Sequence, residues 1–190
     1  MERARSFLAV EISSAIREAL AALIARQQRI EGIDVRWTRP QSMHLTLHFF
    51  GSVELHRLER ASRALAEAAR TCQPFELEVR GIGAFPSLRR PRVIWAGADA
   101  SELAQLTRTM RQTLHELGFE VEDRTFRGHV TLGRLRSDRG WEKLKESLDH
   151  HLDDLFGRCT IDHLVIFRST LQPTGSLYTP LWQISLNNKG

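Results

Sequence analysis

The chain has 190 residues, which is enough for one compact domain or two small lobes of roughly 90 residues each. Its 42% hydrophobic and 26% charged residues are typical of a folded soluble protein and exclude long disordered segments. The net charge of +4 permits an anionic partner without requiring one. The two cysteines, Cys72 and Cys159, form no CxxC pair, which argues against a disulfide scaffold or a cysteine zinc site and favours a cytoplasmic location. Because no apolar run reaches about 18 residues, we expect no membrane span.

Hydrophobic spacing and turn residues predict strands and helices that alternate irregularly along the chain. The expected strands cover 6–12, 35–38, 43–49, 75–79, 93–96, 130–132, 159–168 and 177–186. The expected helices cover 14–29, 55–70, 101–117 and 141–152, with Ser13 and Ser14 as candidate N-caps of the first. Residues 81–91 contain two glycines and two prolines and are expected to form a loop. This mixture favours an α+β or α/β class.

A four-residue motif occurs twice. His44-Leu45-Thr46-Leu47 returns as His129-Val130-Thr131-Leu132, 85 positions later. A predicted strand lies 37 positions before the first histidine and another 36 before the second, and each is separated from its motif by a predicted helix. Chance reproduces one short motif more easily than it reproduces the flanking spacing. The sequence therefore predicts one domain over 1–190, built from repeat halves of about 1–90 and 91–190.

Strand geometry places His44 and Thr46 on one face and Leu45, Leu47 and Phe49 on the other. A single HxT on a strand is usually structural, but a duplicated core strand has no packing reason to repeat its polar positions. Histidine transfers protons in both directions near neutral pH, and a threonine hydroxyl binds an oxyanion. Two such strands across a cleft would suit displacement at phosphorus. One histidine would take a proton from water and the other would give one to the leaving oxygen.

These motifs make the chain resemble the RNA 2′,3′-cyclic phosphodiesterases, historically called 2′-5′ RNA ligases, of the 2H phosphoesterase superfamily. The likeness covers nearly the whole chain, and the segments that carry it are 7–10, 40–51, 81–86, 90–95, 117–119, 126–134 and 169–178. It implies an α+β fold of two pseudo-symmetric lobes, with mostly antiparallel sheets, outer helices and an active-site cleft between the lobes. It also implies hydrolysis of RNA 2′,3′-cyclic phosphate ends, such as those of tRNA fragments, to 2′-phosphate ends. The expected enzyme is a cytoplasmic monomer that needs neither metal nor cofactor.

By the same resemblance, His44 is the proton donor to the departing 3′ oxygen and His129 is the proton acceptor that activates water. Thr46, Thr131 and Arg134 bind the substrate phosphate. The residues themselves leave the two histidine roles open, because a pseudo-symmetric site works in either direction.

Arg134 matches an arginine that the family carries five places after its second motif histidine. Strand alternation alone puts Arg134 on the face away from His129, unless the strand ends or bulges near Gly133. Arg127 has the right alternation but lies on the other side of the histidine. Gly128 stands where the family commonly has proline, and we expect it to loosen His129.

His48 is expected at the cleft rim or the surface, on the face of His44. A zinc site made by the two is excluded, because residues four apart on a strand lie about 13 Å apart. A basic rim that guides RNA is a further expectation, and its arginines are Arg80, Arg89, Arg90 and Arg92.

Three functions remain open from the sequence. The first is the cyclic phosphodiesterase reaction. The second is cleavage or joining of 2′-5′ RNA linkages, or opening of another small cyclic phosphate. The third is a non-catalytic module that binds RNA ends, which the two titrating histidines argue against.

Overall fold

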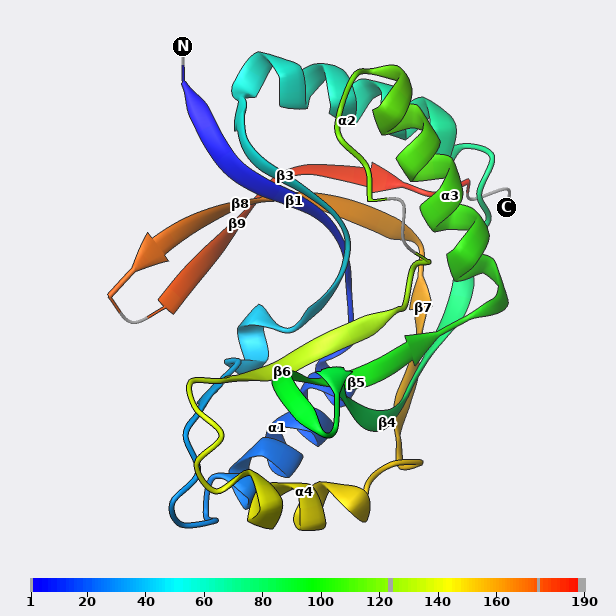
Figure 1. Ribbon diagram of the computed structural model, residues 1–190. Helices are drawn as coiled ribbons and strands as arrows, with labels where there is room; N and C mark the ends of the chain where they lie inside the picture. Colours follow the sequence, from blue (N-terminus) through cyan, green and yellow to red (C-terminus); the bar gives the residue numbers. More distant parts are fainter. Residues whose placement is uncertain (1, 123–124, 174, 188–190) are drawn as a thin grey trace.

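A computed structural model describes residues 2–122, 125–173 and 175–187. Its described part is a nine-stranded antiparallel sheet that curls, with four α-helices on the outside (Figure 1). The strands are β1 Arg3–Glu11, β2 Val35–Trp37, β3 His44–Glu54, β4 Phe75–Ser87, β5 Arg90–Asp99, β6 His129–Leu135, β7 Leu155–Ile161, β8 His163–Gln172 and β9 Gly175–Ser185. The helices are α1 Ser14–Gln27, α2 Leu55–Ala69, α3 Ser101–Glu116 and α4 Trp141–Asp149, with a 3-10 turn, η1, at Pro40–Ser42. This arrangement confirms the α+β class.

The strand order is β7-β4-β5-β6-β3-β1-β8-β9, and β2 pairs with β6 beside this path. We name β3, β1, β8 and β9 the first arm and β6, β5, β4 and β7 the second arm. α2 packs against α3 and β9 over the first arm, whereas α1 packs against β7 and lies with α4 over the second (Figure 1). The expected halves of 1–90 and 91–190 do not map one to each arm. β4 comes from the first half and pairs with β5, while β8 comes from the second half and pairs with β1.

Residues 81–91 form no loop. β4 continues to Ser87 and β5 begins at Arg90, so the segment is the closed end of a long hairpin, in which only Leu88 and Arg89 form a turn. The glycine that suggested a loop, Gly83, is required by packing instead, since a Cβ there would lie 2.2 Å from the ring of Trp95. Pairing with a neighbouring strand thus overrides the local turn preference.

The predicted strand over 159–168 is two strands. β7 ends at Ile161 and β8 begins at His163, so Asp162 alone separates them. β7 pairs with β4 in the second arm, and β8 pairs with β1 in the first. The sequence has no glycine or proline where the chain passes from the second arm to the first, so local patterning does not reveal the break between the two strands.

The core lies between the sheet and the helices. β1 is central to it, with Leu8, Ala9 and Val10 fully buried. Of the two candidate N-caps, Ser13 is the one that caps α1, because its hydroxyl accepts a hydrogen bond from the backbone N–H of Ile16 at 3.4 Å, and Ser14 is the first residue of the helix. Among the helices described, none combines the length and the apolar character that crossing a membrane would need.

Both copies of the motif contain a β-bulge at the same place. Leu47 is the extra residue in the pairing of β3 with β1, and Leu132 is the extra residue in the pairing of β6 with β5. Each directly follows the motif threonine. An extra residue reverses the alternation of side chains in the residues that follow it.

The first bulge overturns the faces expected for β3. Strict alternation places Phe49 in the core and His48 on the face of His44. In the structure Phe49 is 65% exposed, whereas Phe50 is 9% and His48 is 7% exposed. His48 is therefore neither at a cleft rim nor on the surface.

We predict that Phe50→Ala lowers the free energy of unfolding by about 3–5 kcal/mol, because it removes a buried ring. Its neighbour provides the matched control: Phe49→Ala should change stability by less than about 1 kcal/mol. Urea denaturation of the two variants measures both values. Equal losses, or a larger loss for Phe49→Ala, would contradict the bulge.

The buried ring of His48 has an unusual environment for an imidazole. It meets Phe50 edge to face at 4.9 Å, and its Nε2 has no hydrogen-bond partner among the described residues. Burial lowers the pKa of His48 from 6.5 to about 4, and the positive charge of Arg111 lowers it further.

This low pKa predicts a stability loss in mild acid. The unfolded chain takes up a proton on His48 near pH 6.5, but the folded protein does so only near pH 4, so the free energy of unfolding falls between these values. The full contribution is about 3 kcal/mol. Thermal or urea unfolding from pH 7 to pH 4 should show a smaller loss in His48→Leu, while His56→Leu, at an exposed histidine, keeps the wild-type slope. An unchanged slope in His48→Leu would refute the assignment.

Candidate active site

The two motif strands meet at the centre of the sheet. β3 and β6 run antiparallel, and the one position at which the described residues record their pairing joins Leu45 to Val130. These two residues occupy the same place in the two motif copies. A local two-fold axis therefore passes between them, and it relates the rest of one motif to the rest of the other.

The pairing puts four polar side chains on one face of the sheet, opposite the buried Leu45 and Val130. In a regular antiparallel pair with this register, His44 lies across from Thr131 and His129 lies across from Thr46. The diagonal between the two histidines is then on the order of 7–8 Å between Cα atoms. The structure thus brings the predicted histidines and threonines to one place.

Both histidines have a fixed tautomer. Nδ1 of His44 donates to the carbonyl oxygen of Ser42 at 2.8 Å, and Nδ1 of His129 donates to the carbonyl oxygen of Arg127 at 2.8 Å. In each case the acceptor is the residue two positions earlier. A carbonyl oxygen only accepts, so Nδ1 carries the hydrogen and Nε2 is the nitrogen that exchanges protons.

Aromatic rings hold both imidazoles in place. Phe7 stacks on His44 with ring centroids 4.7 Å apart, and Tyr178 meets it edge to face at 5.2 Å. On the other side of the axis, Phe85 meets His129 edge to face at 4.9 Å. These contacts limit the rotation of each ring, which suits a group that transfers a proton along a fixed line.

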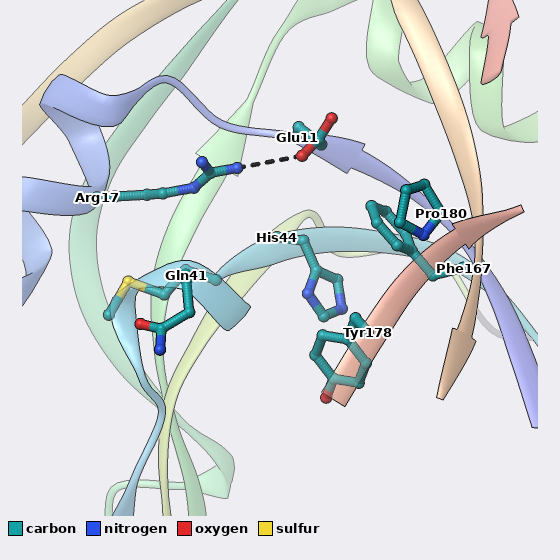
Figure 2. A pocket seen from close by; sticks show the side chains of 8 residues that line it. Glu11, Arg17, Gln41, His44, Phe167, Tyr178 and Pro180 are labelled. Carbon is teal, nitrogen blue, oxygen red and sulfur yellow. Dashed lines mark hydrogen bonds and ion pairs between the residues drawn. The ribbon is translucent and has the colours of Figure 1, made fainter. Parts of the chain in front are cut away.

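His44 opens into a cavity of about 210 Å³ (Figure 2). The cavity is lined by Glu11, Arg17, Gln41, Met43, His44, Phe167, Tyr178 and Pro180. Arg17 and Glu11 form an ion pair at 3.4 Å at its edge. Neither residue stands out in the sequence. Strand pairing places Glu11 beside His44 in the β1–β3 register, and the ion pair holds Arg17, from α1, next to Glu11.

Burial has a strong effect on His44. It lowers the pKa of His44 from 6.5 to about 4, and the charges of Arg17 and His129 add to this while Glu11 opposes it. His44 is therefore neutral in the free protein at pH 7.

The second bulge decides the position of Arg134. Because Leu132 is the extra residue, alternation reverses beyond Thr131, and Arg134 lies on the face of His129. The other candidate, Arg127, holds its guanidinium 4.6 Å from the ring centre of Trp95. Arg134 is thus the exposed cation that follows the motif on the concave side.

Gly128 has a packing role that the sequence does not reveal. A Cβ at this position would lie 2.1 Å from the carbonyl oxygen of Ala98, and the carbonyl of Gly128 accepts a hydrogen bond from the Ala98 N–H at 3.1 Å. The close approach of β5 requires glycine here and ties the residue before His129 to the sheet, rather than freeing it as expected.

Within the described ranges, no group of three or more His, Cys, Asp or Glu side chains is arranged to hold a metal ion. His44 and His48 in particular face opposite sides of β3, because the bulge at Leu47 lies between them.

Comparison with known proteins agrees with this geometry. The LigT like Phosphoesterase family matches residues 10–95 and 97–178. The RNA 2′,3′-cyclic phosphodiesterase of Methanothermobacter thermautotrophicus is 31% identical over 182 residues, covering 94% of this chain and 97% of that protein. The enzyme of the same name from Archaeoglobus fulgidus is 32% identical over 178 residues, covering 93% and 97%.

Solved structures share the fold. The crystal structure of TT0787 of Thermus thermophilus superposes with a TM-score of 0.81 and 28% identity, covering 98% of this chain and all of that one. Escherichia coli LigT, in a complex with 3′-AMP, has the same fold with a TM-score of 0.74 at 23% identity, covering 98% of this chain and 100% of that one. By its motifs, its fold and these matches, the chain is a member of the LigT-like phosphoesterase family.

Proposed function

We propose that this protein hydrolyses RNA 2′,3′-cyclic phosphate ends to 2′-phosphate ends by two-histidine acid–base catalysis without a metal ion. The observation that carries the proposal is the pair of tautomer-fixed imidazoles on one face of the sheet, each with Nδ1 bonded to the backbone. The names of the relatives from M. thermautotrophicus and A. fulgidus support the same substrate.

The proposed reaction is an in-line displacement at phosphorus. His129 Nε2 takes a proton from water as the water oxygen bonds to phosphorus. The bond from phosphorus to the 3′ oxygen breaks, and His44 Nε2 gives that oxygen its proton. The products are a 2′-phosphate monoester and a free 3′-hydroxyl, and one further exchange of protons with solvent restores both histidines.

Three side chains would stabilise the charge that develops on the phosphate. The hydroxyls of Thr46 and Thr131 lie on the same face as the histidines and can donate to non-bridging oxygens. Arg134 brings a full positive charge to this face beyond Thr131. A guanidinium is well suited to this task, because its planar donors match phosphate oxygens.

Substrate binding would raise the pKa of His44, so that its Nε2 takes up from solvent the proton that it later donates. With a pKa of about 4, His44 is neutral in the free protein at pH 7 and cannot act as an acid. A phosphate anion against Nε2 favours the charged imidazolium and raises this pKa. The donor would therefore be charged when the anion is in place, which couples protonation to the presence of substrate.

The proposed setting is a monomer in the cytoplasm that acts on RNA ends, including those of tRNA fragments. The free cysteines Cys72, which is buried, and Cys159, which is half-buried, support a reducing compartment.

Product analysis tests the reaction itself. RNA with a 2′,3′-cyclic phosphate end, incubated with the protein in EDTA, should yield a 2′-phosphate end, separable from the 3′-phosphate isomer by chromatography. Loss of turnover in EDTA would contradict the metal-free mechanism, and a 3′-phosphate product would overturn the leaving group. A chain joined through a 2′-5′ linkage would favour the alternative activity.

Variants of the two histidines test their roles. His44→Ala and His129→Ala should each lower kcat by about 10²–10⁴-fold, the usual loss when a general acid or base is removed. His56→Ala, at an exposed histidine in α2, is the control and should keep wild-type kcat. Near-normal turnover in either motif variant, with an intact fold by circular dichroism, would rule out the two-histidine mechanism.

A further inference from the structure

Of the arginines expected to form a basic rim near residue 90, Arg80 has competing partners. Arg80 forms an ion pair with Glu78 at 2.6 Å and donates to the carbonyl oxygen of Asp153. A different group of arginines stands out. Arg36 on β2, Arg39 before η1 and Arg134 on β6 gather beside the active site, and we call them the arginine triad.

The triad places like charges in direct opposition. Arg36 and Arg134 are cross-strand partners in the β2–β6 register, so their side chains leave the same face of the sheet next to each other. Like charges in this position destabilise a sheet. Such an arrangement is expected where an anion bridges the two charges.

The guanidinium groups of Arg36 and Arg39 converge on the tip of the β8–β9 hairpin. An ideal Cβ built on Gly175, a buried residue, would lie 3.0 Å from Nη2 of Arg39 and 3.3 Å from Nη2 of Arg36. The Nη2 atoms of Arg36 and Arg39 therefore both lie close to one point next to Gly175, which has no side chain. A larger residue there would occupy the space between the two cations.

The described residues give the triad no counter-charge. Arg36, Arg39 and Arg134 are all exposed, and none has an ion pair or a side-chain hydrogen bond with another described residue. Several other arginines are paired, as Arg63 is with Glu59 at 2.7 Å and Arg168 is with Glu2 at 2.8 Å. Three unpaired guanidinium groups at one place form a site for an anion that comes from outside the chain.

The triad borders the proposed catalytic face. Arg134 follows Thr131 by three residues, one of them the bulged Leu132, which corresponds to about 7 Å along β6. Arg39 directly precedes η1, whose end leads into His44. A single RNA strand whose end lies at the histidines could therefore reach the triad with its next phosphates.

We propose that Arg36 and Arg39, beside the Arg134 that faces the cyclic phosphate, bind an internal phosphate of the RNA strand within the first nucleotides next to the cyclic end. This inference rests on the proposed function and extends it to the substrate class, which is an oligonucleotide end rather than a cyclic mononucleotide. Two planar guanidinium groups offer paired donors to one phosphate, which gives both affinity and a fixed strand direction.

Kinetics on two substrates tests this subsite. Arg36→Gln/Arg39→Gln should lower kcat/KM for a tetra-adenylate with a 2′,3′-cyclic phosphate end by tenfold or more, since a hydrogen bond to a charged group contributes about 1.5–3 kcal/mol. The double variant should turn over adenosine 2′,3′-cyclic monophosphate at the wild-type rate. Arg26→Gln/Arg108→Gln removes the same charge from exposed positions on α1 and α3 and should affect neither substrate. Equal losses on both substrates, or none on the tetranucleotide, would overturn the proposal.

Binding provides a readout that does not depend on turnover. Fluorescence anisotropy with a labelled tetra-adenylate ending in a 2′-phosphate should show weaker binding by the Arg36→Gln/Arg39→Gln variant. The slope of log affinity against log salt should become shallower by about 0.7 for the lost phosphate contact. If the wild type binds this RNA but hydrolyses neither substrate, the proposed function fails while the subsite stands. Equal affinity and slope in variant and wild type would refute the subsite whatever the activity.

Discussion

The active site depends on one contact, the pairing of Leu45 with Val130 between β3 and β6. Because the paired residues hold equivalent places in the two motifs, the contact creates the local two-fold axis and sets both histidines on one face. Neither arm of the sheet contains a complete site. The two histidines meet only where the arms join, and a slip of β3 by one residue against β6 would turn one histidine toward the core while the other stays on the concave face.

The bulges after each motif give the two arms different chemistry. Without them, Arg134 would point into the core and His48 would face the histidines. With them, the equivalent positions five residues after each histidine hold an exposed Phe49 in one arm and Arg134 in the other. The axis therefore relates the reacting groups but not their surroundings. An asymmetric substrate needs such a difference, since its phosphate and its nucleoside require different partners.

The sequence predicted the residues of the candidate site better than it predicted the bulges and the ends of the strands. His44, His129 and the two threonines were evident from a repeated motif, because repeated polar residues have no packing explanation. The bulges at Leu47 and Leu132 were not predictable, since an extra leucine in a strand looks like any other. The break at Asp162 and the extension of β4 through Gly83 depend on pairing with distant strands. Glu11 and Arg17 were missed for a similar reason, because only the folded chain brings the end of β1 and the start of α1 to the cavity at His44.

The exchange of β4 and β8 between the arms has a consequence for folding. The first half of the chain contributes β4 to the second arm, and the second half contributes β8 and β9 to the first, so many contacts join residues that are far apart in sequence. Such a topology has a high contact order, and loop closure must precede most of its favourable contacts. It also interlocks the halves, so neither can complete a sheet by itself during synthesis. Bringing the two histidines together therefore requires both halves of the chain, which links an intact site to an intact molecule.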